Sequence, residues 1–130
     1  MRPKDSRTAS KRNALSPMPP IDLSAIPGVP CPCGTSRRAF LGDGAVACSL
    51  HLVEIKNDSR THYHRKLTEV YYFLEGKGQM ELDGKLHPVG PGSAVIIRPG
   101  TRHRAVPGSE PMKVLNFVVP RFDAEDEYFD

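Results

Sequence analysis

Residues 61–76 read THYHRKLTEVYYFLEG, and residues 92–103 read GSAVIIRPGTRH. In the first stretch one residue separates His62 from His64, and Glu69 opens a run rich in Val, Tyr and Phe. If the two histidines lie on a strand, alternation puts both on one face, with Cβ atoms about 6.5–7 Å apart. A carboxylate that follows a four-residue turn can face them. Alone, this spacing fits either a polar strand surface or half of a metal site.

The second stretch favours the metal site. The run SAVIIR has the composition of a strand, a tight turn at Pro99-Gly100 follows, and His103 comes three residues later. An antiparallel barrel can bring His103 to the mouth occupied by the first stretch. A buried unpaired carboxylate costs several kcal/mol and each unsatisfied ring nitrogen about 1–3, against a total stability of about 5–15 kcal/mol. If all four side chains point inward, either a complete hydrogen-bond network or a divalent cation must satisfy them.

Short β-type runs fill most of the chain outward from these stretches. No segment has ten or more residues with helical periodicity. The expected strands are 37–41, 45–55, 69–75, 78–82, 85–89, 93–98, 103–106 and 112–119. Turn signals separate them, and Asp83-Gly84 is the clearest hairpin turn. We therefore predict an all-β fold of about eight short antiparallel strands in a sandwich or barrel.

The ends of the chain differ from this pattern. The 130 residues suit one domain, with a net charge of +3 that is concentrated in a basic N-terminal segment. We expect a disordered basic arm at 1–20, an extended lead-in without helix at 21–36, a β-barrel at 37–122 and an acidic tail at 123–130. No apolar run is long enough to span a membrane, and neither a secretory signal nor a nucleic-acid motif is evident. These features predict a cytoplasmic protein that binds neither membrane nor nucleic acid.

Three cysteines leave an odd count. Cys31 and Cys33 lie in PCPCG, and Cys48 stands alone. An odd number without a secretion signal argues against a disulfide framework. The pair fits a metal or redox role, but zinc ligands usually come as two C-x2-C pairs, and no second pair exists here. The simpler interpretation of Cys31 and Cys33 is that they are two small buried thiols in a turn.

Both quoted stretches match known motifs. The sequence gives H-x-H-x4-E-x6-G from His62 to Gly76 and G-x5-R-P-G-x2-H from Gly92 to His103. In this respect the chain resembles a cupin, a family whose motifs are G-x5-H-x-H-x3,4-E-x6-G and G-x5-P-x-G-x2-H-x3-N. The motifs cover about residues 56–107, and the β pattern extends the resemblance to roughly 37–119.

The resemblance implies a fold and a ligand set. It implies a small single-domain cupin, a jelly-roll barrel whose metal ligands are His62, His64, Glu69 and His103. Three positions depart from the motifs, and none of them is a metal ligand in the family. They are Lys56 in place of Gly, Arg98 in place of Pro, and Pro107 in place of Asn. The departures affect turn geometry and substrate choice more than the metal.

Three imidazoles and one carboxylate suit one divalent transition metal, which can be Fe, Mn, Ni, Zn, Co or Cu. The first expectation is a metal-dependent enzyme, a dioxygenase or an isomerase/lyase, acting on a small polar or anionic metabolite. The alternative is a non-catalytic cupin module that senses a small sugar or acid. Arg60, in phase with the histidines, can hold an anionic group, and Tyr71 can donate a proton or hydrogen bond to substrate. Small cupins commonly pair, so we also expect a homodimer.

Overall fold

The computed structural model describes residues 17–42 and 47–130 of the chain. Most of the expected arm lies outside the described residues, and so does the segment 43–46, which includes the first two residues of the strand expected at 45–55. Within them, one 3-10 turn precedes nine strands. They are η2 (Leu23–Ala25), β1 (Val29–Cys31), β2 (Gly34–Ala39), β3 (Ser49–Ile55), β4 (Thr68–Glu75), β5 (Gly78–Leu82), β6 (Lys85–Val89), β7 (Ala94–Ile97), β8 (His103–Pro107) and β9 (Met112–Val119).

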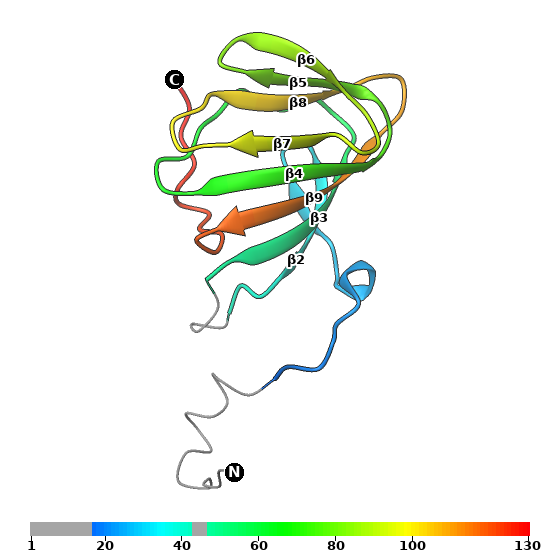
Figure 1. Ribbon diagram of the computed structural model, residues 1–130, viewed down its shortest axis with the longest axis vertical. Helices are drawn as coiled ribbons and strands as arrows, with labels where there is room; N and C mark the ends of the chain where they lie inside the picture. The colour runs from blue at the N-terminus through cyan, green and yellow to red at the C-terminus, as the bar shows by residue number, and fades with distance from the viewer. Residues whose placement is uncertain (1–16, 43–46) are drawn as a thin grey trace, which may run out of the picture.

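The strands form two antiparallel sheets. The larger has six strands in the order β1-β2-β3-β9-β4-β7, and the smaller has three in the order β6-β5-β8. In Figure 1 the small sheet lies at one end of the barrel, above β7 and β4. Buried side chains from both sheets meet in a single core cluster. Its members are Val53, Ile55, Phe73, Met80, Ile97, Ala105, Met112 and Val114. The predicted all-β barrel class is confirmed.

Strict alternation of side chains explains which residues reach the interior. Along β3, every second residue from Ser49 to Ile55 is buried, and β9 buries Met112 and every second residue after it. The hairpin between β5 and β6 turns at Asp83-Gly84, where both residues have positive φ, 48° and 83°. This is the left-handed geometry that an Asp-Gly hairpin turn requires.

The segment before residue 37 is more structured than expected. The chain makes a single 3-10 turn at Leu23–Ala25, where the Asp22 side chain accepts a hydrogen bond from the Ser24 amide at 3.0 Å. Strand β1 is additional to the expected set, and β2 already begins at Gly34. Hydrophobic periodicity could not reveal these elements, because β1 is only three residues long and mostly exposed, and a one-turn helix depends on one local cap.

The last eight residues pack against the loop that carries the histidines. Tyr128 and Tyr63 form an isolated β-bridge, and Figure 1 shows the C-terminal segment passing beside the ends of the strands. The Asp126 carboxylate accepts three backbone hydrogen bonds, each 2.9 Å long, from consecutive amides. The donors are Arg65, Lys66 and Leu67. Residues 123–130 therefore hold the loop of His64 in place.

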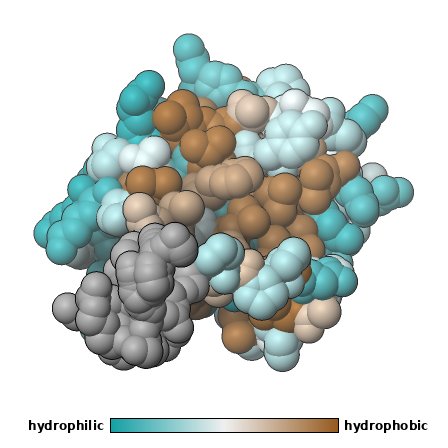
Figure 2. All heavy atoms as spheres, turned by 60° about the horizontal axis from the view of Figure 1, so that its bottom comes forward, coloured by the Kyte–Doolittle hydropathy of each residue, from teal (hydrophilic) through white to brown (hydrophobic). Residues whose placement is uncertain are grey.

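Apolar side chains also gather on the outside of the barrel. Figure 2 shows a broad hydrophobic band on one face of the molecule. Outward-facing positions of β4, β7 and β9 contribute exposed large residues, among them Tyr72, Ile96, Phe117 and Val119. Among the described residues, no helix is long and apolar enough to cross a membrane.

Candidate metal centre

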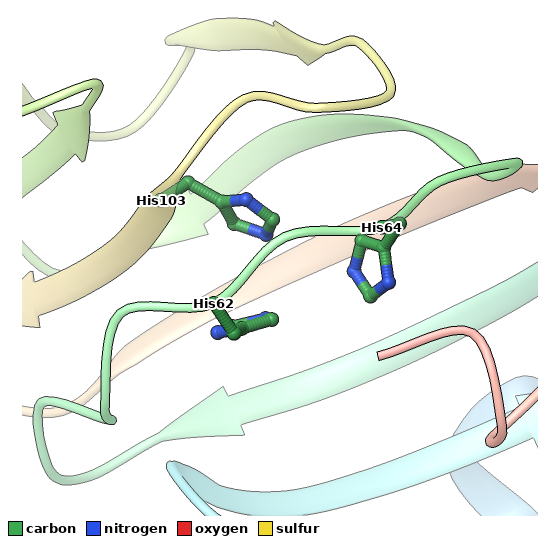
Figure 3. Close-up of side chains that lie close together, drawn as sticks. All are labelled: His62, His64 and His103. Carbon is green, nitrogen blue, oxygen red and sulfur yellow. The ribbon is translucent and has the colours of Figure 1, made fainter. Parts of the chain in front are cut away.

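The three predicted histidines meet at one point. His62 and His103 form a β-bridge in which each backbone amide donates to the other's carbonyl, at 3.1 and 2.9 Å. One ring nitrogen from each of His62, His64 and His103 lies within 4.8 Å of the others. Figure 3 shows His103 reaching from β8 toward the two rings on the loop before β4. His62 and Tyr63 form isolated bridges and His64 follows them, so these residues do not make the regular strand that the sequence suggested, yet both histidine rings reach the same point.

Glu69 adjoins two of these rings. Its Oε1 lies 3.3 Å from the Nε2 atoms of both His64 and His103. Its Oε2 accepts a hydrogen bond from the Asn116 amide nitrogen at 2.8 Å. Glu69 is the second residue of β4 and is buried there, in phase with the core residue Phe73. The group of mutually close ligand atoms consists of the three histidines, and Glu69 contacts that group through His64 and His103.

Backbone carbonyls fix the orientation and tautomer of each imidazole. Because a carbonyl can only accept, every Nδ1 bonded to one must carry a proton, so in the neutral ring the lone pair is on Nε2. The pairs are His62 with the carbonyl of Arg60 at 3.0 Å, His103 with that of Thr101 at 2.9 Å, and His64 with that of Asp126. Metal-binding histidines commonly have this arrangement, since it orients the ring and raises its basicity.

Several buried polar atoms at this point have no hydrogen-bond partner among the described residues. They include His64 Nε2, His103 Nε2 and Glu69 Oε1, which face one another. When the rings are neutral, neither Nε2 can donate to the carboxylate, and each unsatisfied buried group then costs about 1–3 kcal/mol against a domain's stability of about 5–15 kcal/mol. A divalent cation that accepts both nitrogen lone pairs and the carboxylate charge removes this cost. The donor set therefore fits a borderline transition metal.

The charges of the site are strongly coupled. Burial raises the pKa of Glu69, but the two neighbouring imidazoles outweigh burial and hold it well below its usual range. Burial lowers the pKa of His64, but the Glu69 carboxylate and the Asp126 carbonyl raise it to about 9. Burial and the neighbouring His103 lower the pKa of His62. Without a metal, these opposite shifts favour an ion pair between a His64 imidazolium and the Glu69 carboxylate at neutral pH.

A cavity of about 110 Å³ opens onto these residues. Both sequence-predicted substrate residues line it. Arg60 is exposed, with its guanidinium carbon 4.4 Å from the centre of the Phe129 ring. Tyr71 is partly buried against Phe73, and burial raises the pKa of its hydroxyl well above the ordinary value.

Other residues of the site were not identified from the sequence. Arg38 and His51 line the cavity, Asn116 holds Glu69, and Asp126 holds the His64 loop. Strand alternation contained a signal for His51, which is in phase with the buried Val53. Asp126 gave no such signal, because its partners lie 59–61 residues away in the chain.

These features define a small antiparallel β-barrel whose interior holds three converging histidines and a glutamate. The sequence model of the Cupin domain family matches residues 50–118, more than half of the chain. The chain therefore belongs to the cupin family, and the expected family membership is confirmed.

Comparisons with individual proteins agree with this assignment. Over 76 residues the chain is 34% identical to an uncharacterized protein of Methanocaldococcus jannaschii, covering 58% of this chain and 61% of that protein. Over 71 residues it is 35% identical to L-ectoine synthase of Halomonas elongata, covering 52% of each. The match thus spans about half to three fifths of these relatives. A crystal structure of a Planctomyces limnophilus protein superposes with a TM-score of 0.80 and 38% identity, covering 89% of this chain and 99% of that one.

Proposed function

We propose that this cupin is a metal-dependent enzyme of the lyase or isomerase type that acts on a small anionic metabolite. The observation that carries the proposal is the group of unsatisfied ligand atoms of His64, His103 and Glu69 beside an arginine-lined cavity. Similarity to L-ectoine synthases, at 33–35% identity over half or more of this chain, favours this reaction type over the dioxygenase alternative.

His62, His64, His103 and Glu69 would hold the metal. A divalent ion bound there would act as a Lewis acid toward an oxygen atom of the substrate. Other groups of the chain hold the ligand side chains in position. Backbone carbonyls keep each Nδ1–H in place, and Asn116 fixes one carboxylate oxygen of Glu69. These contacts keep the ligand atoms in position before the metal arrives.

The arginines would select an anionic substrate. Arg38 and Arg60 both line the cavity, and each guanidinium lies over an aromatic ring, Phe122 at 4.6 Å and Phe129 at 4.4 Å. Stacking restricts the guanidinium plane. Nε of Arg38 donates to Ser36 Oγ at 3.2 Å, so the terminal N–H groups are the ones that would bind a carboxylate or phosphate. The small cavity volume of about 110 Å³ restricts the substrate to a small molecule.

Tyr71 would supply a proton. Burial and the nearby Glu69 charge raise its pKa, so the hydroxyl stays protonated at neutral pH and can donate. His51 also lines the cavity, and burial followed by the charge of Arg38 lowers its pKa to about 4. It is therefore neutral, and Ser49 lies 2.9 Å from its Nε2. A pKa of about 4 makes His51 a weak base at neutral pH, so Tyr71 is the candidate acid and His51 a hydrogen-bonding group of the cavity wall.

The test is turnover by protein reconstituted separately with Mn, Fe, Co, Ni, Cu or Zn. Each form is incubated with small hydroxy acids, amino acids and sugar phosphates, and NMR follows loss of water or rearrangement while an electrode follows dioxygen. Product formation without dioxygen uptake supports the proposal. Stoichiometric dioxygen uptake would point to the oxygenase alternative. Ligands that raise the melting temperature but emerge unchanged from every metal form would point to a binding module.

We also propose that two copies pair through the outer face of the large sheet. Phe117 and Val119 are 42% and 49% exposed there, which is unusual for large apolar residues on neighbouring positions of one strand face. A monomeric mass by sedimentation at micromolar concentration would contradict this pairing.

A further inference from the structure

Two thiols share the cavity with the metal ligands. The Sγ atoms of Cys31 and Cys33 lie 3.6 Å apart, and neither cysteine is in a disulfide. Both residues are partly buried and line the cavity that also contains His64 and Glu69. They lie outside the segment matched by the family, and the function proposed above uses neither of them. Cys48, the third cysteine, does not line this cavity.

The backbone holds the two thiols together. Cys31 ends β1, Cys33 lies in the tight turn, and Cys31 pairs with Gly34 at the start of β2. The Cys33 carbonyl accepts hydrogen bonds from the amides of Lys56 and Asn57, at 2.7 and 3.1 Å. These bonds anchor the turn to the end of β3, so the contact between the sulfurs is built into the fold.

Gly34 makes this close anchoring possible. A Cβ atom at Gly34 would lie 2.0 Å from the carbonyl oxygen of Glu54, which no side chain tolerates. The turn therefore sits directly against β3, and Cys33 cannot move away from Cys31 without breaking its bonds to that strand. A disulfide of about 2.05 Å requires the two sulfurs to approach by about 1.5 Å. Rotation of the two side chains is the movement available to achieve it.

The two thiols differ in acidity. A hydrogen bond from Cys33 is the largest influence on Cys31 and lowers its pKa to about 6, whereas the same contact and burial raise the pKa of Cys33. At neutral pH the pair is therefore one thiolate and one thiol. A thiolate beside a protonated neighbour is the arrangement of an attacking and a resolving cysteine.

We propose that Cys31 and Cys33 form a peroxide-responsive dithiol in the wall of the substrate cavity. The Cys31 thiolate attacks hydrogen peroxide, the O–O bond breaks, and with one proton taken up the products are a sulfenic acid and water. The Cys33 thiol then attacks that sulfur, a second water leaves, and a disulfide closes. The two electrons lost by the sulfurs reduce the peroxide, and the cavity wall loses one negative charge.

The size of the kinetic effect follows from the acidity of Cys31. A thiol with pKa about 6 is about 90% ionised at pH 7, against about 3% for an unperturbed thiol of pKa about 8.5. This gain of about 30-fold is reduced about tenfold by the weaker nucleophilicity of a more acidic thiolate. We expect Cys31 to react about threefold faster than an unperturbed model thiol.

The experiment uses the full chain and the matched variants Cys48→Ser, which keeps the pair, and Cys33→Ser, which removes the resolving thiol. After treatment with hydrogen peroxide, intact mass spectrometry of Cys48→Ser should show a loss of about 2 Da that dithiothreitol reverses. Cys33→Ser should instead accumulate a sulfenic acid at Cys31 that a cyclic 1,3-diketone traps.

Three results would overturn the proposal. They are retention of both thiols in Cys48→Ser, direct conversion of Cys31 to sulfinic acid without a disulfide, and a wild-type disulfide that contains Cys48. Because wild type and Cys48→Ser both keep the pair, the test does not depend on the folding of Cys33→Ser. The experiment measures the mass of the protein, so its result does not depend on whether the proposed metal site or enzymatic activity exists.

Discussion

Metal binding at neutral pH should release about one proton, and its affinity should rise with pH. The pKa of His64 in the metal-free protein is about 9, so at pH 7 only about 1% of the rings are free to bind a metal. Displacing that proton costs two pH units times 1.36, or about 2.7 kcal/mol. The apparent Kd should therefore fall about tenfold per pH unit from pH 7 to 9 and level off above.

Isothermal titration calorimetry in buffers with different ionisation enthalpies measures how many protons metal binding releases. The slope of the observed enthalpy against buffer enthalpy gives the number of protons released, about one at pH 7. In Glu69→Gln the carboxylate that raises the pKa of His64 is gone, while Asn116 can still bond to the amide oxygen. Proton release at pH 7 should then fall well below one. Tight wild-type binding with no proton release and a flat Kd from pH 7 to 9 would refute the reasoning.

Four further predictions follow from named contacts. In metal-free protein the raised pKa of His64 gives stability that is complete below about pH 6.5 and lost as pH rises through about 9, so the melting temperature should fall across that range. Asp126→Ala removes the carboxylate that accepts three backbone hydrogen bonds and should cost about 3–4 kcal/mol in urea unfolding, whereas Asp126→Asn, which keeps one oxygen, should cost about half as much; equal losses would contradict this account. Tyr71→Phe should lower kcat by about 10²–10⁴-fold while metal affinity stays within about twofold, and an unchanged kcat would exclude Tyr71 as the acid. Phe117→Lys should convert the proposed dimer to monomer in sedimentation velocity, without loss of stability, because the side chain is 42% exposed.

The sequence predicted the barrel well because alternation and turn chemistry are local. The run at 112–119 and the Asp83-Gly84 hairpin appear in the structure at the expected residues. The short strand β1 was missed, since three mostly exposed residues carry no alternation signal.

The candidate site was predictable only in part. Motif spacing identified His62, His64 and His103, because their separation along the chain reflects two segments, the loop before β4 and the start of β8, that the fold brings together. The supports of the site depend on long-range packing. Asp126 reaches the His64 loop from the segment expected to be an acidic tail, and Asn116 on β9 reaches Glu69 on the neighbouring strand β4. Neither contact could be inferred without the fold.

The metal content of purified protein tests the central proposal most directly. Metal-free chain is reloaded with Co or Zn, desalted, and analysed by inductively coupled plasma mass spectrometry, with circular dichroism to check folding. We predict about one ion per chain for wild type and for His87→Gln, a control at an exposed histidine outside the site. His103→Ala, which removes a fully buried ligand, should retain less than about a tenth of an ion. Wild-type protein that retains no metal, or His103→Ala that retains as much as wild type, would contradict the proposed metal centre.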